Sequence, residues 1–231
     1  MAASDPPSET GRSKLSFGLR TGVRFLNPLG SVDATVHSST TDPPQTTTIA
    51  SKSATKRYPV GPTMHVQFTD RWGLSFDALY SRAGYDASSK TETQPEGEED
   101  PDFISALYER TRADYWDFPV LARYYYTGFQ DDPARLFISA GVAARAVSGI
   151  QTFSEFVVEE GVRSDTSATP VKPEHRAVLG AVVGGGLRLL DEVGLKVDME
   201  VRYTRWIQRV FDSSVARSSA NEGTVYIGFS F

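Results

Sequence analysis

The chain has no cysteine among its 231 residues, which excludes disulfide frameworks, thiolate metal sites and a cysteine nucleophile. It also lacks any run of 18 or more apolar residues, so helical membrane spans are excluded. Membrane strands are not excluded, because they need apolar residues only at alternate positions. An excess of positive charge is missing too. The formal net charge is -5, so nucleic acid is not an expected partner.

The N-terminus lacks the features of a signal peptide. Residues 1–7 contain neither a basic region nor an apolar core. We therefore expect either a mature form that carries an added Met1 or a soluble protein. Residues 1–13 are expected to be a flexible segment ahead of a single domain over residues 14–231.

A two-residue alternation of apolar and polar residues runs through the rest of the chain. In residues 14–27 the odd positions from Leu15 to Phe25 are mostly apolar, whereas the even positions include Arg20 and Arg24. A strand sends successive side chains to opposite faces, so this period predicts a strand and not a helix. The same pattern predicts eight strands, over residues 14–27, 58–69, 74–85, 116–126, 135–149, 176–190, 195–206 and 225–231.

Long and short connections alternate between these strands. Residues 28–57, 86–115, 150–175 and 207–222 form long connections, whereas 69–73, 127–134 and 191–194 form short ones. Outer-membrane barrels have short periplasmic turns and longer extracellular loops. The sequence therefore predicts an all-β fold, an eight-stranded antiparallel up-and-down transmembrane β-barrel in a bacterial outer membrane.

The charged face of the predicted strands must point into the barrel, because a charged side chain facing lipid at the bilayer midplane costs about 2–4 kcal/mol. An eight-stranded barrel has room only for side chains, and buried charges need partners. We therefore predict a salt-bridge network in which Asp77, Asp198 and Glu200 are the acids. Its predicted members are Arg20, Arg24, Asp77, Arg123, Arg145, Arg188, Lys196, Asp198, Glu200 and Arg202.

Aromatic residues gather near both ends of the predicted strands. Amphipathic rings prefer the headgroup level, so two aromatic girdles are expected. The girdle near the short turns comprises Trp72, Tyr124, Tyr126, Phe229 and Phe231. The girdle near the long connections comprises Tyr58, Tyr80, Trp116, Tyr203 and Trp206.

Four segments of the chain resemble the PorT-like outer-membrane β-barrel proteins. They are residues 117–124 (DFPVLARY), 184–188 (GGGLR), 200–203 (EVRY) and 227–231 (IGFSF). The resemblance implies the fold and the location, and it implies no catalytic residue, because the group includes adhesins, secretion accessories and proteins of unknown role. The alternate residues Val225, Ile227, Phe229 and Phe231 look like the C-terminal signal read by the barrel-assembly machinery, and an ordinary apolar final strand is the alternative.

Other chemistry is weakly signalled. His37, His65 and His175 have no zinc-binding spacing, and no feature marks His175 with Ser148 or Ser167 as a base and a nucleophile. The acidic run over residues 96–102 is better explained as a solvated loop than as a cation site. We expect no metal, no cofactor and no enzymatic activity.

Three functions compete at this stage. The first is a non-enzymatic barrel with a structural or surface-contact role. Its outer surface would consist of the 28–57 connection and two hairpins that continue through residues 105–114 and 151–158. The second is a narrow transport or small-ligand barrel that uses the charged lumen, and the third is a soluble lipocalin-like binding barrel with apolar residues inside. For a membrane barrel, the expected partners are membrane lipid, lipopolysaccharide and the barrel-assembly machinery, and we expect a monomer.

Overall fold

A computed structural model of the chain describes residues 14–26, 29–30, 32–38, 45–93, 102–126, 133–158, 163–167, 172–191, 193–212 and 217–231. The segment 1–13, which we expected to be flexible, lies outside these residues. None of the described residues forms a helix of the length and hydropathy that a membrane span requires. The strands are β1 (Lys14–Arg24), β2 (Leu29–Gly30), β3 (Val32–Ser38), β4 (Gln45–Ser53), β5 (Val60–Gln67), β6 (Trp72–Asp77), β7 (Leu79–Thr93), β8 (Asp102–Tyr125), β9 (Ala134–Val158), β10 (Arg163–Ser167), β11 (Ala177–Leu190), β12 (Lys196–Trp206), β13 (Arg217–Ser218) and β14 (Asn221–Ser230).

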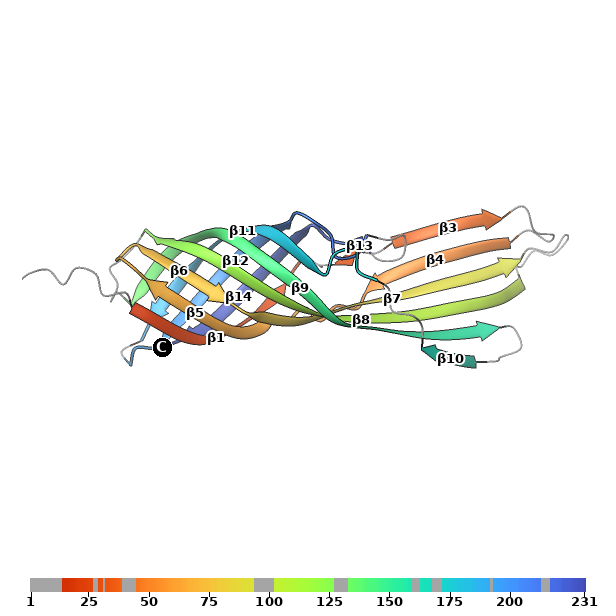
Figure 1. Cartoon of the computed structure of the whole chain (residues 1–231), viewed down its shortest axis with the longest axis horizontal. Coiled ribbons are helices and arrows are strands. Elements are labelled where there is room, and N and C mark those ends of the chain that lie inside the picture. Colours follow the sequence, from red (N-terminus) through yellow and green to blue (C-terminus); the bar gives the residue numbers. More distant parts are fainter. Residues whose placement is uncertain are drawn as a thin grey trace, which may run out of the picture.

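The strands close into a ring with eight positions, in the order β1, β5, β6 with β7, β8, β9, β11, β12 and β14, which pairs back with β1. Every neighbouring pair is antiparallel. Figure 1 shows this barrel with the C-terminus at the end that carries the short turns. The predicted eight-stranded up-and-down barrel is therefore confirmed.

One predicted strand, over residues 74–85, is interrupted at Ala78 between β6 and β7. Ala78 donates its backbone N–H to the carbonyl of Pro62 on β5 at 3.0 Å. Pro62 has no N–H to donate in return, so the ladder loses one hydrogen bond at this point. β6 and β7 still occupy a single position in the ring, because both pair with β5 and with β8.

The two faces of the barrel wall differ as the alternation predicts. Apolar side chains such as Leu19, Val142 and Leu179 are exposed on the outside, whereas Arg24 and Arg123 are completely buried inside. A lipocalin-like barrel would place these two classes the other way round. The arrangement therefore overturns that alternative and gives the barrel an apolar outer belt.

Three strands are much longer than a membrane crossing needs. β7, β8 and β9 have 15, 24 and 25 residues, and about 9–11 residues suffice for a tilted crossing. Their distal parts join other strands in the order β3, β4, β7, β8, β9, β10, which we call the extracellular sheet. Figure 1 shows this sheet projecting from one end of the barrel. The hairpins expected at 105–114 and 151–158 are confirmed.

The 28–57 segment is more than a connection, because it contributes β3 and β4 to the extracellular sheet. Its sequence conceals these strands. β4 reads QTTTIASKS, which has no continuous apolar face. Pairing with β7 over nine residue pairs, from Gln45 opposite Thr93 to Ser53 opposite Tyr85, holds β4 in place instead.

A bulge lies where β9 leaves the barrel. Between Asp114 and Arg112 the pairing of β8 with β9 shifts by one residue. Gly149 sits in the bulge with φ of +59°, and a Cβ there would lie 2.5 Å from the Asp114 carboxylate, so only glycine fits. The extra residue moves the outward face of β9 from even positions to odd ones, which places Phe153 on the outside.

A charged residue introduced in the middle of the apolar belt should destabilise the barrel. Val142 is 61% exposed and pairs with Val120, midway along β8 between Trp116 and Tyr124. We expect Val142→Arg to lower the free energy of unfolding in lipid vesicles by about 2–4 kcal/mol, because the charge would face hydrocarbon. Urea titration read by heat-modifiable gel migration measures this change.

The matched control is Val193→Arg, in the short turn between β11 and β12, where Val193 is 78% exposed. That variant should change the free energy of unfolding by no more than about 0.5 kcal/mol. Equal effects of the two substitutions would contradict the assignment of the belt to lipid.

Candidate functional site

The lumen holds two clusters of ion pairs, built by the inward positions of the ring strands. The turn-side cluster comprises Arg20, Asp77, Arg123, Arg188, Asp198, Glu200 and Arg202. The loop-side cluster comprises Arg24, Asp117, Arg145 and Glu222. All of these side chains are buried.

Glu200 is the centre of the turn-side cluster. Its Oε2 accepts hydrogen bonds from Arg20 at 3.0 Å, from Arg123 at 2.7 Å and from Arg202 at 2.9 Å. Its Oε1 accepts one from the Ser139 hydroxyl at 2.7 Å. One carboxylate thus ties together β1, β8, β9 and β12.

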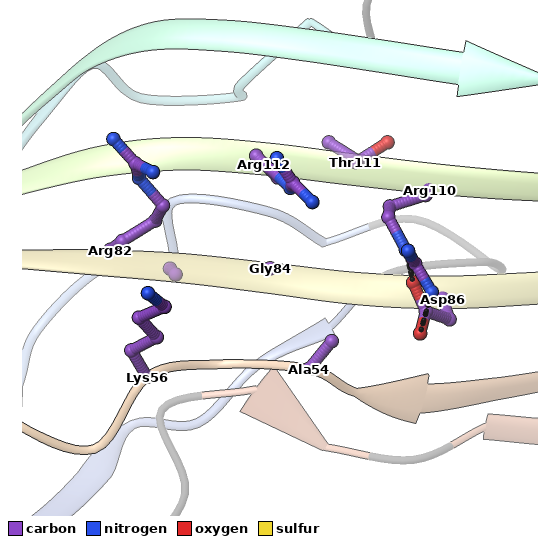
Figure 2. A pocket seen from close by; sticks show the side chains of 9 residues that line it. Ala54, Lys56, Arg82, Gly84, Asp86, Arg110, Thr111 and Arg112 are labelled. Atoms are coloured by element: carbon purple, nitrogen blue, oxygen red, sulfur yellow. Dashed lines mark hydrogen bonds and ion pairs between the residues drawn. The ribbon is translucent and has the colours of Figure 1, made fainter.

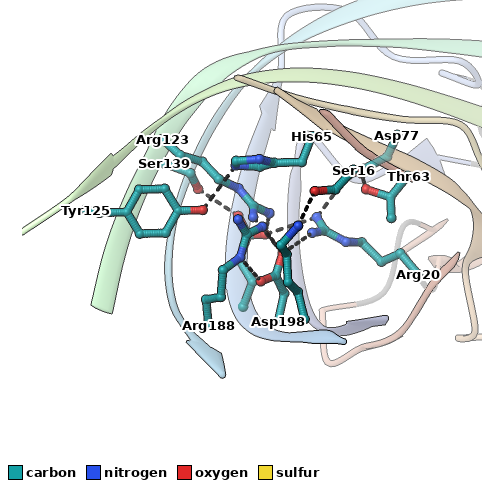
Figure 3. A network of polar contacts seen from close by, with 12 residues as sticks. Ser16, Arg20, Thr63, His65, Asp77, Arg123, Tyr125, Ser139, Arg188 and Asp198 are labelled. Atoms are coloured by element: carbon teal, nitrogen blue, oxygen red, sulfur yellow. Dashed lines mark hydrogen bonds and ion pairs between the residues drawn. The ribbon is translucent and has the colours of Figure 1, made fainter. Parts of the chain in front are cut away.

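Two aspartates complete this cluster, and Figure 3 shows how the side chains converge. Arg188 donates two hydrogen bonds to Asp198, at 2.7 and 2.9 Å, and Arg123 adds a third at 2.7 Å. Asp77 Oδ2 accepts from Arg20 at 3.0 Å and from Arg202 at 2.7 Å. Charge-assisted and forked pairs of this kind are strong because both partners are ionised and their geometry is fixed.

The loop-side cluster is balanced, with two arginines and two carboxylates. Arg145 donates to Asp117 at 2.6 and 2.8 Å and to Glu222 at 2.6 Å. Arg24 donates to Glu222 at 2.5 Å and to Asp117 at 2.9 Å, and its third contact is the Ser81 hydroxyl at 2.8 Å. Each arginine thus bridges both acids, which provides the pairing that buried charge requires.

Sequence reasoning did not include Asp117 and Glu222 among the acids of the network. Asp117 lies in the predicted strand over residues 116–126, six residues before Arg123 and therefore on the same face. Glu222 was placed in a long connection, although it lies in β14. The alternation does indicate this position, because Glu222 lies at an even position like the inward residues Thr224 and Tyr226.

Trp206 does not belong to the loop-side girdle, contrary to the sequence-based expectation. It is only 4% exposed and points into the lumen, where the Arg145 guanidinium lies 4.1 Å from its ring centroid. The parity of β12 explains this, because Tyr203 faces outward and a residue three positions later faces inward. A cation stacked on an indole face in a dry site is stabilising.

The other predicted girdle residues of the barrel wall face outward. Trp72 packs on Tyr124 with ring centroids 5.0 Å apart, and Tyr80 packs on Trp116 at 5.3 Å. Tyr58, Tyr126 and Tyr203 are exposed on the same outer surface.

The residues of the possible assembly signal also point outward. Val225, Ile227, Phe229 and Phe231 are all exposed along the outer face of the final strand and at the chain end. Their role in assembly stays a prediction.

An apolar layer covers the loop-side cluster. Leu29, Val210 and Phe211 come from the first and last long connections and pack in one buried group with Tyr115 and Trp206. The short pairing of β2 with β13 joins these two connections. Apolar contacts therefore close this part of the lumen at the end nearest the extracellular sheet.

Little space remains between the two clusters. A cavity of about 20 Å³ is lined by Asp117, Arg202, Trp206, Glu222 and Tyr226 among others. A single water needs about 10–15 Å³, so the cavity has room for about one water. Glycine contributes to the close packing, because a Cβ at Gly22 would lie 2.6 Å from the Tyr226 ring. Side chains thus fill the described part of the lumen between the two clusters.

The remaining polar residues considered from the sequence lie apart from one another. Lys196 is half-buried and donates to the Ser16 hydroxyl at 2.5 Å. His65 Nε2 lies 3.0 Å from the Tyr125 hydroxyl, and His175 Nδ1 donates to the Arg209 carbonyl at 3.2 Å. Among the described side chains, no three histidine or acidic residues form a possible metal site. Residues 96–101 of the acidic run lie outside the described part of the chain.

A second candidate site is a groove of about 930 Å³ on the outward face of the extracellular sheet, which we call the outer groove. Tyr108 and Phe153 line it and are 50% and 55% exposed. In the same groove, Arg110 donates to both carboxylate oxygens of Asp86, at 2.7 and 3.2 Å. The hydrogen bond to Asp86, followed by the charge of that carboxylate, raises the pKa of Arg110 above its ordinary value.

Comparison with known proteins gave one family and several similar structures. The family described as outer membrane protein beta-barrel domain matches residues 3–212. No curated protein matches the chain.

Three solved structures illustrate the similarity. Ail, the attachment invasion locus protein of Yersinia pestis, solved in complex with the heparin analogue sucrose octasulfate, is 12% identical over 96% of this chain and 99% of its own, with a TM-score of 0.36. Neisserial surface protein A is 11% identical over 94% of each chain, with a TM-score of 0.39. OprG from Pseudomonas aeruginosa is 13% identical over 95% of this chain and 96% of its own, with a TM-score of 0.46.

Removing the central charge of the turn-side cluster should destabilise the barrel. We expect Glu200→Gln to lower the free energy of unfolding in vesicles by about 3–5 kcal/mol, because three buried guanidinium groups lose their shared counter-charge. Glu174→Gln, an exposed site in the connection before β11, is the control and should have almost no effect. A loss below about 1 kcal/mol for Glu200→Gln would show that the ion pairs do not hold the barrel together.

Proposed function

We propose that this chain, which belongs to the family of outer membrane protein beta-barrel domains, is a closed, non-enzymatic barrel that presents a contact surface outside the cell. Its location in the bacterial outer membrane and its barrel fold are the premise of this proposal. The surface-contact role is what we add to them.

The observation that carries the proposal is the continuation of the barrel wall into the extracellular sheet. β8 and β9 stay paired from the barrel out to Ser105 and Val158, so the sheet is a rigid extension and not a set of separate loops. Function is commonly placed on outer segments that a rigid scaffold positions. A ladder of this length would place a recognition surface well away from the membrane.

The chemistry of the outer groove supports the same role. Aromatic and arginine side chains dominate the binding energy of protein interfaces. Tyr108 and Phe153 leave about half of their surface open, and the Arg110–Asp86 ion pair lies in the same groove. The groove is broad and open, which suits contact with a surface better than enclosure of a small molecule.

The lumen gives less support to transport. Within each of its two clusters arginines pair with carboxylates, and the layer around Val210 and Phe211 covers the loop-side end. The cavity of about 20 Å³ between the two clusters is too small for a hydrated ion. These features favour a structural role for the buried charges.

Within the family, we assign the chain to the PorT-like members. The assignment rests on the four segments at residues 117–124, 184–188, 200–203 and 227–231. Three of these segments contribute Asp117, Arg123, Arg188, Glu200 and Arg202 to the lumen clusters. The shared segments would therefore preserve the packing of the barrel and not an activity.

A closed barrel should not conduct. We expect the purified protein in planar bilayers to give no discrete conductance steps, because the lumen is filled and covered. Steps whose size increases with salt concentration would contradict the closed barrel and support the transport alternative.

The outer groove should mediate adhesion of bacteria to cells. Bacteria that display the protein should adhere to immobilised cells more than bacteria without it, and the double variant Tyr108→Ser with Phe153→Ser should reduce this gain about tenfold, since each ten-fold change needs only about 1.4 kcal/mol. Val193→Ser, at the opposite end of the barrel, is the matched control. Equal adhesion with and without the wild-type protein would argue against the contact role.

A further inference from the structure

A cluster of basic side chains lies on the outward face of the wall, where the barrel passes into the extracellular sheet. Lys56, Arg82, Arg110 and Arg112 surround a pocket of about 280 Å³, which we call the basic pocket. Figure 2 shows the arginines on β7 and β8 and Lys56 on the segment after β4, around Gly84. The pocket lies beside the outer groove and shares Asp86, Arg110 and Arg112 with it.

The floor of the pocket is open because its residues are small. Gly84 on β7 pairs with Arg112 on β8, and Ala54 follows β4 on the other side. A side chain at Gly84 would begin 3.1 Å from the Thr111 carbonyl oxygen and would occupy this floor. The absence of a side chain leaves room for an anion beside the cations.

Two of the four cations are already paired and two are not. Arg110 binds Asp86, and Arg82 donates to Asp114 at 3.3 Å and to the Tyr80 hydroxyl at 3.3 Å. No hydrogen-bonding or ionic partner for the Arg112 guanidinium or the Lys56 ammonium group exists among the residues that the structure describes. Counting Asp86 and Asp114, the pocket keeps two uncompensated positive charges.

The height of the pocket on the wall points to its ligand. Tyr80 and Trp116 form part of the loop-side girdle, which belongs at the headgroup level. Arg82 follows Tyr80 by two residues on the same face, a rise of about 7 Å, and Arg112 lies four residues beyond Trp116, about 13 Å. The cations therefore face the lipid side of the wall at the headgroup layer and just outside it.

We propose that the basic pocket binds a phosphate group of an anionic glycolipid in the outer leaflet, the chemistry found in lipopolysaccharide. Arg112 and Lys56 donate charge-assisted hydrogen bonds to the phosphate oxygens, and the anion sits over Gly84. Arg82 and Arg110, each paired with its own carboxylate, complete the wall of the pocket. This inference rests on the location in the outer membrane and is independent of the contact role of the outer groove.

The test measures binding of bisphosphorylated lipid A to the full-length protein in detergent micelles, with the monophosphorylated lipid as the comparison. The wild-type protein should bind the bisphosphorylated lipid more tightly. The double variant Lys56→Gln with Arg112→Gln should weaken that binding at least tenfold. Heat-modifiable gel migration establishes that each variant is folded.

The matched control is Arg205→Gln. Arg205 lies two residues beyond Tyr203, as Arg82 lies beyond Tyr80, and it is exposed on the outer face of β12, where it bonds to Asn221. This variant should bind within twofold of the wild type, because Arg205 is outside the cluster.

Three results would overturn the proposal. The first is unchanged binding in the double variant, and the second is an equal loss in Arg205→Gln, which would reflect overall charge. The third is displacement of the lipid by millimolar inorganic phosphate, which would identify a site for free anions. Loss of adhesion in the outer-groove variants, with lipid binding retained, would leave the basic pocket intact and separate the two proposals.

Discussion

The pairing of arginines with carboxylates inside the lumen is the constraint on which the rest of the structure depends. Lipid outside the wall excludes charge from the middle of the outer face, so charged side chains at that depth of the crossing strands must turn inward. Inside a narrow barrel those charges are stable only with partners from distant strands. Glu200 illustrates the result, because it draws arginines from β1, β8 and β12 onto one carboxylate. These ion pairs therefore both link distant strands across the lumen and occupy its interior.

A filled lumen moves function to the outside of the molecule. The wall does not stop at the membrane, because β7, β8 and β9 continue as one paired sheet and gain β3, β4 and β10. The bulge at Gly149 decides what that sheet displays, since it brings Phe153 to the face that carries Tyr108. The outward face thus changes with height, from an apolar belt to an aromatic girdle, then the basic pocket, and finally the outer groove.

The sequence predicted much of the candidate site because inward or outward direction is a local property. Parity alone placed residues such as Arg20, Arg123 and Asp198 in the lumen, and the structure buries them there. The errors came from applying parity incompletely. Trp206 lies in the lumen because it alternates with the outward residue Tyr203, and Glu222 belongs to β14 because it continues the inward positions of that strand. Ala78 differs, because its interruption depends on Pro62 in a neighbouring strand.

By itself, then, the sequence determined the all-β barrel, its apolar outer belt and its charged interior, since a two-residue period and lipid contact leave no other placement for those side chains. Only the tertiary structure decided which arginine meets which carboxylate, that β3 and β4 join the extracellular sheet, and that Lys56, Arg82 and Arg112 meet around Gly84. The physical reason is the range of the interactions. Alternation acts between adjacent residues, whereas pairing register, bulges and clusters depend on strands far apart in the chain.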